Sequence, residues 1–186
     1  MPTSKPKVLI VIARLNVGGT AQYIYEVSKG LIALGYEVLV ATGYVQGAER
    51  EAEVVSELPI RRVPSLGRKV SFVKDLAARR ELKKVIAEYQ PDLIYSHTFK
   101  AGVIARTFKS GVKKVHAFHG HLLDEPELKG LKVRLVIGVE RYLAPRAKYL
   151  VTVGKKVADE LLAERIGTRA QYRSIRSEEH TSELQS

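Results

Sequence analysis

The sequence predicts an α/β protein with a doubly wound, mostly parallel, Rossmann-like sheet and helices on both of its faces. Short apolar runs alternate along the chain with segments of helical periodicity, which is typical of this class. The first run, 8–13, ends in a loop with Gly18 and Gly19 and leads directly into a helical pattern. A second run, 37–42, follows that helix and completes a βαβ unit with a right-handed crossover.

The other elements of the first half continue this alternation. In order, we expect a helix over 21–34, a strand over 37–42, a weaker charged helix over 46–58, a strand over 60–63 and a basic helix over 72–89. Gly35 follows the first helix as a C′ residue, and Gln90 with Pro91 ends the basic helix. The apolar residues of the basic helix can share one face: Phe72, Val73, Leu76, Leu82, Val85, Ile86 and Tyr89.

The second half repeats the pattern, which gives six or seven strands in all. We expect a strand over 92–96, a helix over 101–109, a strand over 114–118, a long helix over 127–144, a strand over 149–153 and a helix over 155–165. Gly130 and Gly138 are weak points of the long helix. Gly167 ends the last helix, and a further strand should follow it.

Composition restricts the classes of function. A chain of 186 residues suits one good-sized domain, which we place at 1–175. It contains no Cys, which excludes disulfides, thiolate zinc sites and a cysteine nucleophile. Neither a signal peptide nor a membrane-spanning segment is expected. The formal net charge of +11 favours polyanionic partners, although a merely soluble basic surface gives the same count.

The last eleven residues, 176–186, differ from the rest of the chain. They read RSEEHTSELQS, are polar, and have no usable period. They resemble the translation of a common sequencing-adapter oligonucleotide. We therefore expect a non-native tail joined to a truncated reading frame, and exclude it from the fold.

The glycine turn predicts an anion-binding site, because amides at a helix N-terminus attract phosphates at the carboxyl ends of parallel strands. We expect a phosphate-bearing ligand near Gly18, Gly19 and Thr20. A dinucleotide fingerprint needs a third glycine and an acidic residue after the second strand, where Thr42 and Gly43 stand instead. No P-loop motif occurs either. Two glycines alone are equally typical of a simple tight turn.

Two more clusters follow strand ends. His97 and Lys100 come after the fourth strand and suit an anion or hydroxyls, or a capped helix with solvated neighbours. His116 lies within the fifth strand, His119 at its end and His121 beyond it, and the spacing of these three imidazoles allows a zinc site. Side chains alternate between the two faces of a strand, so the three imidazoles should not all meet at one point. We therefore expect His119 to line the ligand cleft and His116 to be packed in the strand, and we expect no metal ion here. The ends of the first, fourth and fifth strands should meet at one crevice, and this convergence favours a functional site there.

Four segments together resemble one family. They are VGGT at 17–20, PDLIYSHTFKAG at 91–102, VHAFHGH at 115–121 and VERYLAPRAKYLVTVGKKV at 139–157. They are similar to the N-terminal domain of the family-4 retaining glycosyltransferases, which have the two-domain GT-B architecture. The resemblance covers nearly everything from Lys7 to Gly167, so the fold is expected to be the N-terminal half of that architecture. The second domain, which binds most of the nucleotide-sugar donor, is missing from the sequence.

The resemblance also implies roles for individual residues. Gly18, Gly19 and Thr20 would contact the donor phosphate and sugar, and Gly120 would allow close approach. His119 would be the catalytic residue beside the donor sugar, whereas His97 and Lys100 would line the acceptor side. The family generally needs no metal and no cofactor beyond the nucleotide sugar as substrate. Sugar transfer with retention of the anomeric configuration is expected to proceed by front-face attack of the acceptor.

The resemblance thus implies a glycosyltransferase that moves a sugar from a nucleotide sugar to a glycan or polyprenyl-linked acceptor, with the fragment alone inactive. Relatives with lipid acceptors place a basic surface on anionic membranes, so the protein is expected in the cytoplasm or at the inner face of the membrane. The matching surface here is Arg68, Lys69, Arg79, Arg80, Lys83 and Lys84. A solvated face of a packed helix explains the same charges. The main alternative is a non-catalytic basic module that binds anionic membranes or polyanions. Aromatic residues are not interleaved with the charge, which argues against single-stranded nucleic acid. A second alternative is a complete small Rossmann-like enzyme for phosphate-bearing substrates, which would bind a nucleotide tightly by itself.

Overall fold

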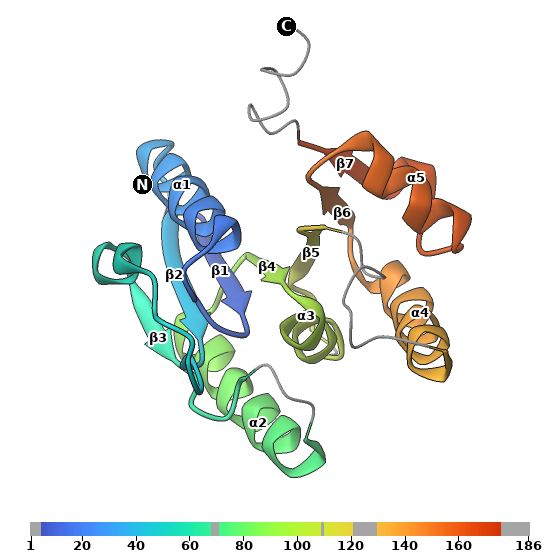
Figure 1. Ribbon diagram of the computed structural model, residues 1–186. Helices are drawn as coiled ribbons and strands as arrows, with labels where there is room; N and C mark the ends of the chain where they lie inside the picture. The colour runs from blue at the N-terminus through green and yellow to red at the C-terminus, as the bar shows by residue number, and fades with distance from the viewer. Residues whose placement is uncertain (1–4, 68–70, 109, 121–129, 176–186) are drawn as a thin grey trace, which may run out of the picture. The chain divides into compact units, whose positions relative to one another are not determined.

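The computed structural model describes residues 5–67, 71–108, 110–120 and 130–175 (Figure 1). The chain divides into two compact units, residues 1–114 and 115–186, and each is described by itself. All the recorded strand pairs are parallel. The α/β class with parallel strands and a Rossmann-like alternation of helices is therefore confirmed. The single domain over 1–175 stays a prediction.

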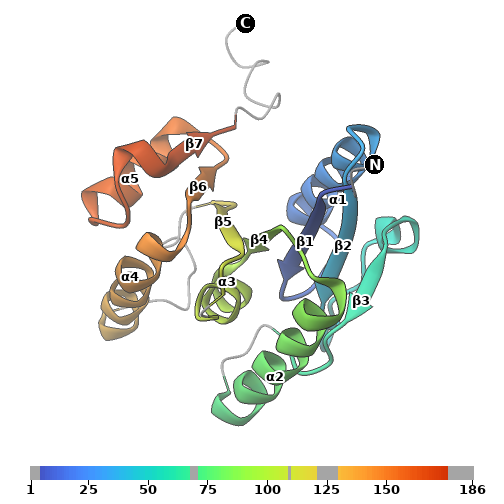
Figure 2. The ribbon, with the colours of Figure 1, turned by 180° about the vertical axis from the view of Figure 1, so that it is seen from behind.

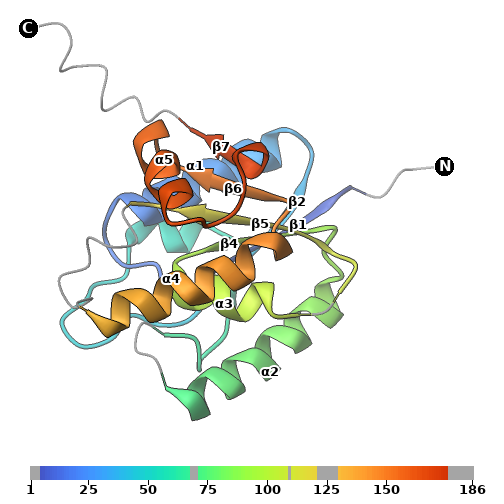
Figure 3. The same ribbon diagram turned by 90° about the vertical axis from the view of Figure 1, so that its right-hand side faces the viewer.

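The first unit holds four parallel strands in the order β3-β2-β1-β4 (Figure 2). Its elements are β1 (Lys7–Ile12), α1 (Gly19–Ala33), β2 (Glu37–Thr42), the 3₁₀ turn η1 (Glu53–Glu57), β3 (Ile60–Arg62), α2 (Phe72–Tyr89), β4 (Leu93–His97) and α3 (Phe99–Arg106). Helix α1 covers one face of these strands, and α2 and α3 cover the other (Figure 3).

The alternation of side chains along β1 explains why helices cover both faces of these strands. Leu9 and Val11 of β1 pack with Leu82 of α2 and Ile104 of α3 in one buried cluster. Ile10, between them in sequence, is equally buried and points to the opposite face, where α1 lies. Both faces of β1 are thus apolar, as parallel sheets require. The predicted site residues lie at or after the ends of the strands, but His97 is the last residue of β4 and not, as expected, a residue beyond it.

The second unit holds three parallel strands in the order β5-β6-β7. Its elements are β5 (Lys113–Phe118), whose first two residues belong to the first unit, α4 (Leu131–Leu143), the 3₁₀ turn η2 (Ala144–Arg146), β6 (Tyr149–Thr152), α5 (Lys155–Ala163), the 3₁₀ turn η3 (Arg169–Gln171) and β7 (Tyr172–Ser174). Leu150 of β6, Leu161 of α5 and Tyr172 of β7 share its core.

Three sequence predictions are wrong. Residues 46–58 form a loop and the turn η1 rather than a helix, because long-range hydrogen bonds hold the segment against the loop after β1. The long helix begins at Leu131 and not at 127: Gly130 has φ +57 and precedes the first turn, and 127–129 lie outside the described residues. The apolar residues of α2 do not share one face: the buried face is formed by Ala78, Leu82 and Val85, whereas Phe72, Val73 and Leu76 are 87%, 76% and 39% exposed.

None of the described helices is long and apolar enough to cross a membrane. The strand over 37–42 and the helix over 72–89 are confirmed to the residue. Gly35 has φ +88 after α1, as expected of a C′ glycine, and Gln90 ends α2 in the left-handed region.

Candidate functional site: strand ends and the glycine turn

The turn between β1 and α1 presents an open helix N-terminus. Gly18 is the N-cap of α1 with φ +152 and ψ 172, a conformation that side chains rarely adopt. Gly18 and Gly19 are exposed, and a Cβ at either would meet no atom within 4 Å. The first amides of a helix have no acceptor within it. These N–H groups, together with the partly exposed Thr20, can therefore hold an anion.

A clamp that the sequence analysis missed holds this turn. Arg14 Nε donates to both carboxylate oxygens of Glu49, at 2.8 and 2.7 Å. The N–H of Val17 donates to the carbonyl of Arg50 at 3.0 Å, directly before the glycines. A charged loop over 46–52 looks helical locally, and no sequence signal reveals these partners. The loop after β2 thus positions the anion-binding turn.

Thr98 brings the ends of β1 and β4 together. The strands are parallel neighbours, with Val11 opposite Ser96. Thr98 has φ +65, which is unusual for a β-branched residue, and its Oγ1 accepts a hydrogen bond from the N–H of Ala13 at 3.4 Å. Backbone outliers of this kind cluster at functional sites. The two predicted clusters in the first unit are therefore linked through their strand ends.

His97 lies beneath helix α1, fully buried. Its ring centroid is 4.2 Å from that of Tyr95 and 5.9 Å from that of Tyr23, whose hydroxyls are hydrogen-bonded at 2.7 Å. Burial raises the pKa of Tyr95 far above its usual range and raises the pKa of Tyr23 as well. Both phenols are therefore neutral at pH 7. The acceptor role of His97 stays a prediction.

Lys100 forms an ion pair with Asp75 in the first turn of α2. Lys100 Nζ lies 2.6 Å from Asp75 Oδ1, and its side chain is 7% exposed. The other oxygen, Oδ2, accepts a hydrogen bond from the N–H of Ser71 at 3.1 Å and so caps α2. Lys100 therefore connects the start of α3 to the start of α2. Its acceptor role also stays a prediction.

The second unit carries His119 and Gly120, immediately after β5. Burial lowers the pKa of His119 to about 4, so its imidazole is neutral at pH 7. Gly120 is exposed, with no atom within 4 Å of a Cβ placed there. His116 is buried in the strand, edge-on to Phe118, as predicted for a packed residue. His121 lies outside the described residues, and the choice between a cleft histidine and a metal ligand stays a prediction.

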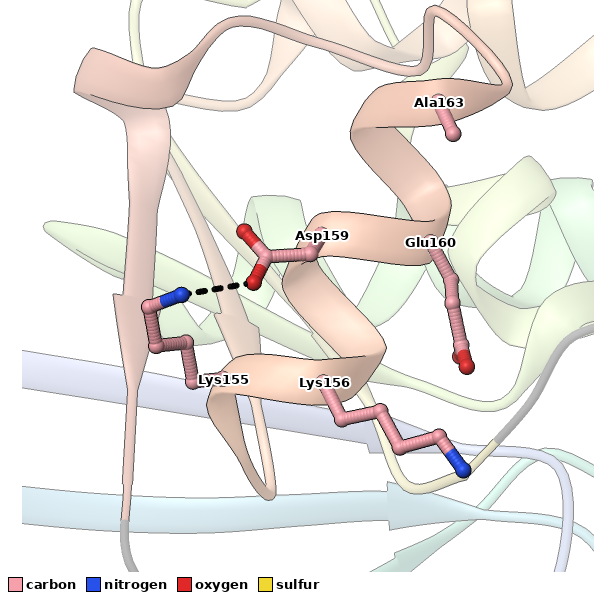
Figure 4. A pocket seen from close by; sticks show the side chains of 5 residues that line it. All are labelled: Lys155, Lys156, Asp159, Glu160 and Ala163. Atoms are coloured by element: carbon pink, nitrogen blue, oxygen red, sulfur yellow. Dashed lines mark hydrogen bonds and ion pairs between the residues drawn. The ribbon is translucent and has the colours of Figure 1, made fainter.

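A shallow pocket in the second unit lies along α5 and includes none of the predicted site residues. Its lining is Lys155, Lys156, Asp159, Glu160 and Ala163 (Figure 4). Lys155 Nζ pairs with Asp159 at 2.8 Å. Two cations and two anions on one helix leave no strong field of either sign. This pocket is therefore a poor match for a phosphate.

Comparison with known proteins decides the family. Residues 18–176 match the model of the glycosyl transferase 4-like domain, from the glycine turn onward. The chain belongs to this family. The resemblance to family-4 glycosyltransferases that the four segments predicted is thereby confirmed. Membership places the Gly18–Gly19 turn and the histidine after β5 inside a recognised transferase domain.

Relatives and solved structures agree with the family. The chain is 30% identical to "Putative glycosyltransferase EpsD" of Bacillus subtilis (strain 168) over 132 residues, 66% of this chain and 32% of that protein. It is 30% identical over 74 residues to the UDP-Gal:alpha-D-GlcNAc-diphosphoundecaprenol alpha-1,3-galactosyltransferase of Escherichia coli, 38% of this chain and 19% of that one. Sucrose-phosphate synthase from Thermosynechococcus elongatus shares the fold, with a TM-score of 0.69 at 16% identity, over 92% of this chain and 48% of its own. The match spans less than half of each of these proteins.

The basic surface of this glycosyl transferase 4-like domain is partly described. Arg68 and Lys69 lie outside the described residues. The other four cations are exposed on α2: Arg79, Arg80, Lys83 and Lys84. Lys84 Nζ lies 3.8 Å from Glu88, and the guanidinium of Arg79 lies 5.1 Å from the ring centroid of Phe108. The surface is cationic as predicted, and its membrane role stays a prediction.

Replacing Gly18 by alanine should lower the free energy of unfolding by about 1–2 kcal/mol, because a side chain is strained at φ +152 even in open space. Gly19→Ala is the matched control, since its site is equally open and has no positive φ; it should change stability by less than about 0.5 kcal/mol. Urea unfolding of both variants measures the difference. Equal effects would show that the conformation of Gly18 is not required.

Proposed function

We propose that this chain is the N-terminal, acceptor-side domain of a retaining glycosyltransferase. The enzyme would transfer a hexose-like unit from a nucleotide sugar to a glycan or polyprenyl-linked acceptor. The observation that carries the proposal is the family match over residues 18–176, which starts at an exposed glycine N-terminus suited to phosphate. The E. coli relative, whose name contains UDP-Gal and a diphosphoundecaprenol acceptor, supports both substrate classes.

The proposed chemistry breaks the bond between the anomeric carbon and the donor diphosphate. The acceptor hydroxyl forms its bond on the same face, and its proton passes to a diphosphate oxygen. The amides of Gly18, Gly19 and Thr20 stabilise the charge that develops on the leaving diphosphate. This role requires donors fixed before the reaction, which the Arg14–Glu49 clamp provides. No side-chain nucleophile, metal or cofactor takes part in the proposed step.

His119 is assigned to the donor sugar. A neutral imidazole offers one N–H donor and one acceptor nitrogen, which suits a sugar hydroxyl and avoids a fixed positive charge. The lowered pKa of about 4 keeps it in this state over the physiological range. Gly120 permits close approach of the sugar, because no side chain stands there. Lys100 and His97 would lie on the acceptor side.

We further propose that the enzyme works in the cytoplasm, at the inner face of the membrane, with α2 toward anionic lipid. Phe72 and Val73 are exposed at the start of this helix, beside its cations Arg79, Arg80 and Lys83. Apolar and cationic groups together are typical of interfacial helices. The same surface is what a non-catalytic basic module would use, and that alternative predicts vesicle binding without sugar transfer.

Two experiments test the proposal. Reading the source DNA beyond codon 175, the last one assigned to the native chain, should reveal a second α/β domain. A native stop codon there would overturn the transferase function. Titration of the isolated chain with UDP-galactose, followed by amide NMR, should show weak binding, with a Kd of about 1 mM or more and shifts at Gly18, Gly19 and Thr20. Micromolar binding would instead show a complete small nucleotide enzyme.

A further inference from the structure

Helix α4 of the second unit carries an apolar stripe on its solvent side. Leu131, Leu135 and Tyr142 are 81%, 67% and 65% exposed, and Gly138 is exposed between them. Their spacing of four, three and four residues places them on one face. The opposite face is already used, because Val136, Ile137, Glu140 and Leu143 are buried. The helix is therefore apolar on two faces, and its own fold needs only one of them.

Cations border the exposed stripe on both sides. At 100° per residue, Lys132 lies on one flank of the stripe, and Arg134 and Arg141 lie on the other; all three are exposed. The guanidinium of Arg146 stacks on the ring of Tyr142, 3.9 Å from its centroid. The one acidic residue of the helix, Glu140, is buried on the opposite face. Of these cations, and among the residues that the structure describes, only Arg141 has an acidic partner, the carboxylate of Glu164 at 3.3 Å.

This arrangement selects among occupants by charge. A second copy of the chain would bring the same cations against each other across the stripe. Nucleic acid would satisfy the cations and leave the leucines uncovered. An anionic bilayer satisfies both, because leucine side chains enter the acyl boundary while the long Lys and Arg side chains extend to phosphate headgroups. Tyrosine at the end of such a stripe suits the headgroup level.

We propose that α4 lies flat on an anionic lipid membrane, with Leu131, Leu135 and Tyr142 inserted at the interface and Lys132 and Arg134 on headgroup phosphates. This contact is separate from the cationic surface of α2. It goes beyond the proposed sugar transfer, which requires no lipid contact by the second unit. A site of this kind would add to the affinity from α2 when both engage one membrane.

The chain contains no Trp, so a single substitution reports on the stripe itself. Tyr142→Trp is compared with Tyr44→Trp, at a 49% exposed position in the first unit. Vesicles contain equal parts of phosphatidylglycerol and phosphatidylcholine, or phosphatidylcholine alone. With the anionic vesicles, Tyr142→Trp fluorescence should shift to the blue and be quenched by brominated acyl chains, and Tyr44→Trp fluorescence should not. No shift for Tyr142→Trp would overturn the proposal and leave a protein partner for the stripe.

Vesicle co-sedimentation measures the affinity. Leu131→Ser/Leu135→Ser should weaken binding to anionic vesicles about tenfold, since exposed leucines contribute through insertion alone. Ile32→Ser/Leu34→Ser removes exposed apolar groups of the first unit and should leave binding unchanged. Lys132→Glu/Arg134→Glu should weaken binding to anionic vesicles about tenfold or more. Its control, Lys29→Glu/Arg50→Glu, changes the net charge by the same amount at exposed positions of the first unit and should weaken binding much less.

Charge reversal of Lys83 and Lys84 on α2 distinguishes membrane binding through α2 from membrane binding through α4. If Lys83→Glu/Lys84→Glu abolishes binding while both α4 variants bind as tightly as the parent chain, the inference is overturned. Sugar transfer is read independently, with a soluble acceptor and the protein from the complete reading frame, because the 186-residue chain alone is expected to be inactive. Transfer without vesicle contact by α4 would overturn this inference alone, and vesicle contact without transfer would overturn the proposed function alone.

Discussion

Gly43→Ala should lower the free energy of unfolding by about 3 kcal/mol or more. A Cβ at this position would lie 1.5 Å from the carbonyl oxygen of Leu66 and 2.8 Å from that of Ala13. Both atoms belong to the backbone, so no side-chain rotation relieves the clash. Gly43 N–H also donates to the carbonyl of Ala13 at 3.1 Å, and Arg62 donates to the Gly43 carbonyl at 2.9 Å. Moving the chain here would break these bonds.

Gly30→Ala is the matched control, with the opposite expected sign. Gly30 lies inside α1, with no atom within 4 Å of a Cβ. Alanine should stabilise this exposed helix position by about 0.5–1 kcal/mol. Urea unfolding of both variants, followed by circular dichroism, gives the two values. If Gly43→Ala were as stable as the parent chain, the close crossing of the segments after β1, β2 and β3 would be wrong.

The pH dependence of stability should carry a contribution from His119. Burial lowers its folded-state pKa to about 4, below the value of about 6.5 in an unfolded chain. Between these values the unfolded state binds more protons, so stability rises with pH and is lost as the pH falls from about 6.5 toward 4. From pH 7 to pH 5 the expected loss from this residue is about 2 kcal/mol.

His119→Gln should remove that part of the slope. Urea unfolding of the parent chain and the variant at pH 7 and pH 5 measures it. The ring resonance that disappears in the variant identifies His119, and its NMR titration should have a midpoint near 4. A midpoint near the ordinary histidine value, with an unchanged slope in the variant, would contradict burial of this imidazole and the neutral form assigned to it.

An element was predicted correctly where its local sequence preference agreed with the contacts that it makes in the tertiary structure. The strand Glu37–Thr42 and the helix Phe72–Tyr89 were predictable to the residue, because periodicity and clear end signals coincide there. Segment 46–58 was not, because its backbone bonds are long-range: Asn16 forms an antiparallel bridge with Glu51, and Ala52 N–H donates to Leu15. No local pattern contains those partners.

The candidate site shows the same division. The tight turn at Gly18 before α1 was predictable, because a glycine pair between a strand and a helical pattern marks such a turn, and its role toward a ligand stays a prediction. The role of Gly43 as a crossing point was not, since the neighbours that demand it, Ala13 and Leu66, are distant in sequence. The pairing of Lys100 with Asp75 was equally hidden. Spacing indicated which residues follow strand ends, and packing determined which side chains they meet.

The most direct measurement is sugar transfer by the protein from the complete reading frame. The assay supplies UDP-galactose and related nucleotide sugars, with a diphosphopolyprenyl-linked sugar as acceptor. The proposal predicts a product that keeps the donor's anomeric configuration, a loss in kcat/KM of about 100-fold or more for a folded His119→Ala variant, and no transfer by the 186-residue chain alone. An inverted product, or full activity in His119→Ala, would contradict it.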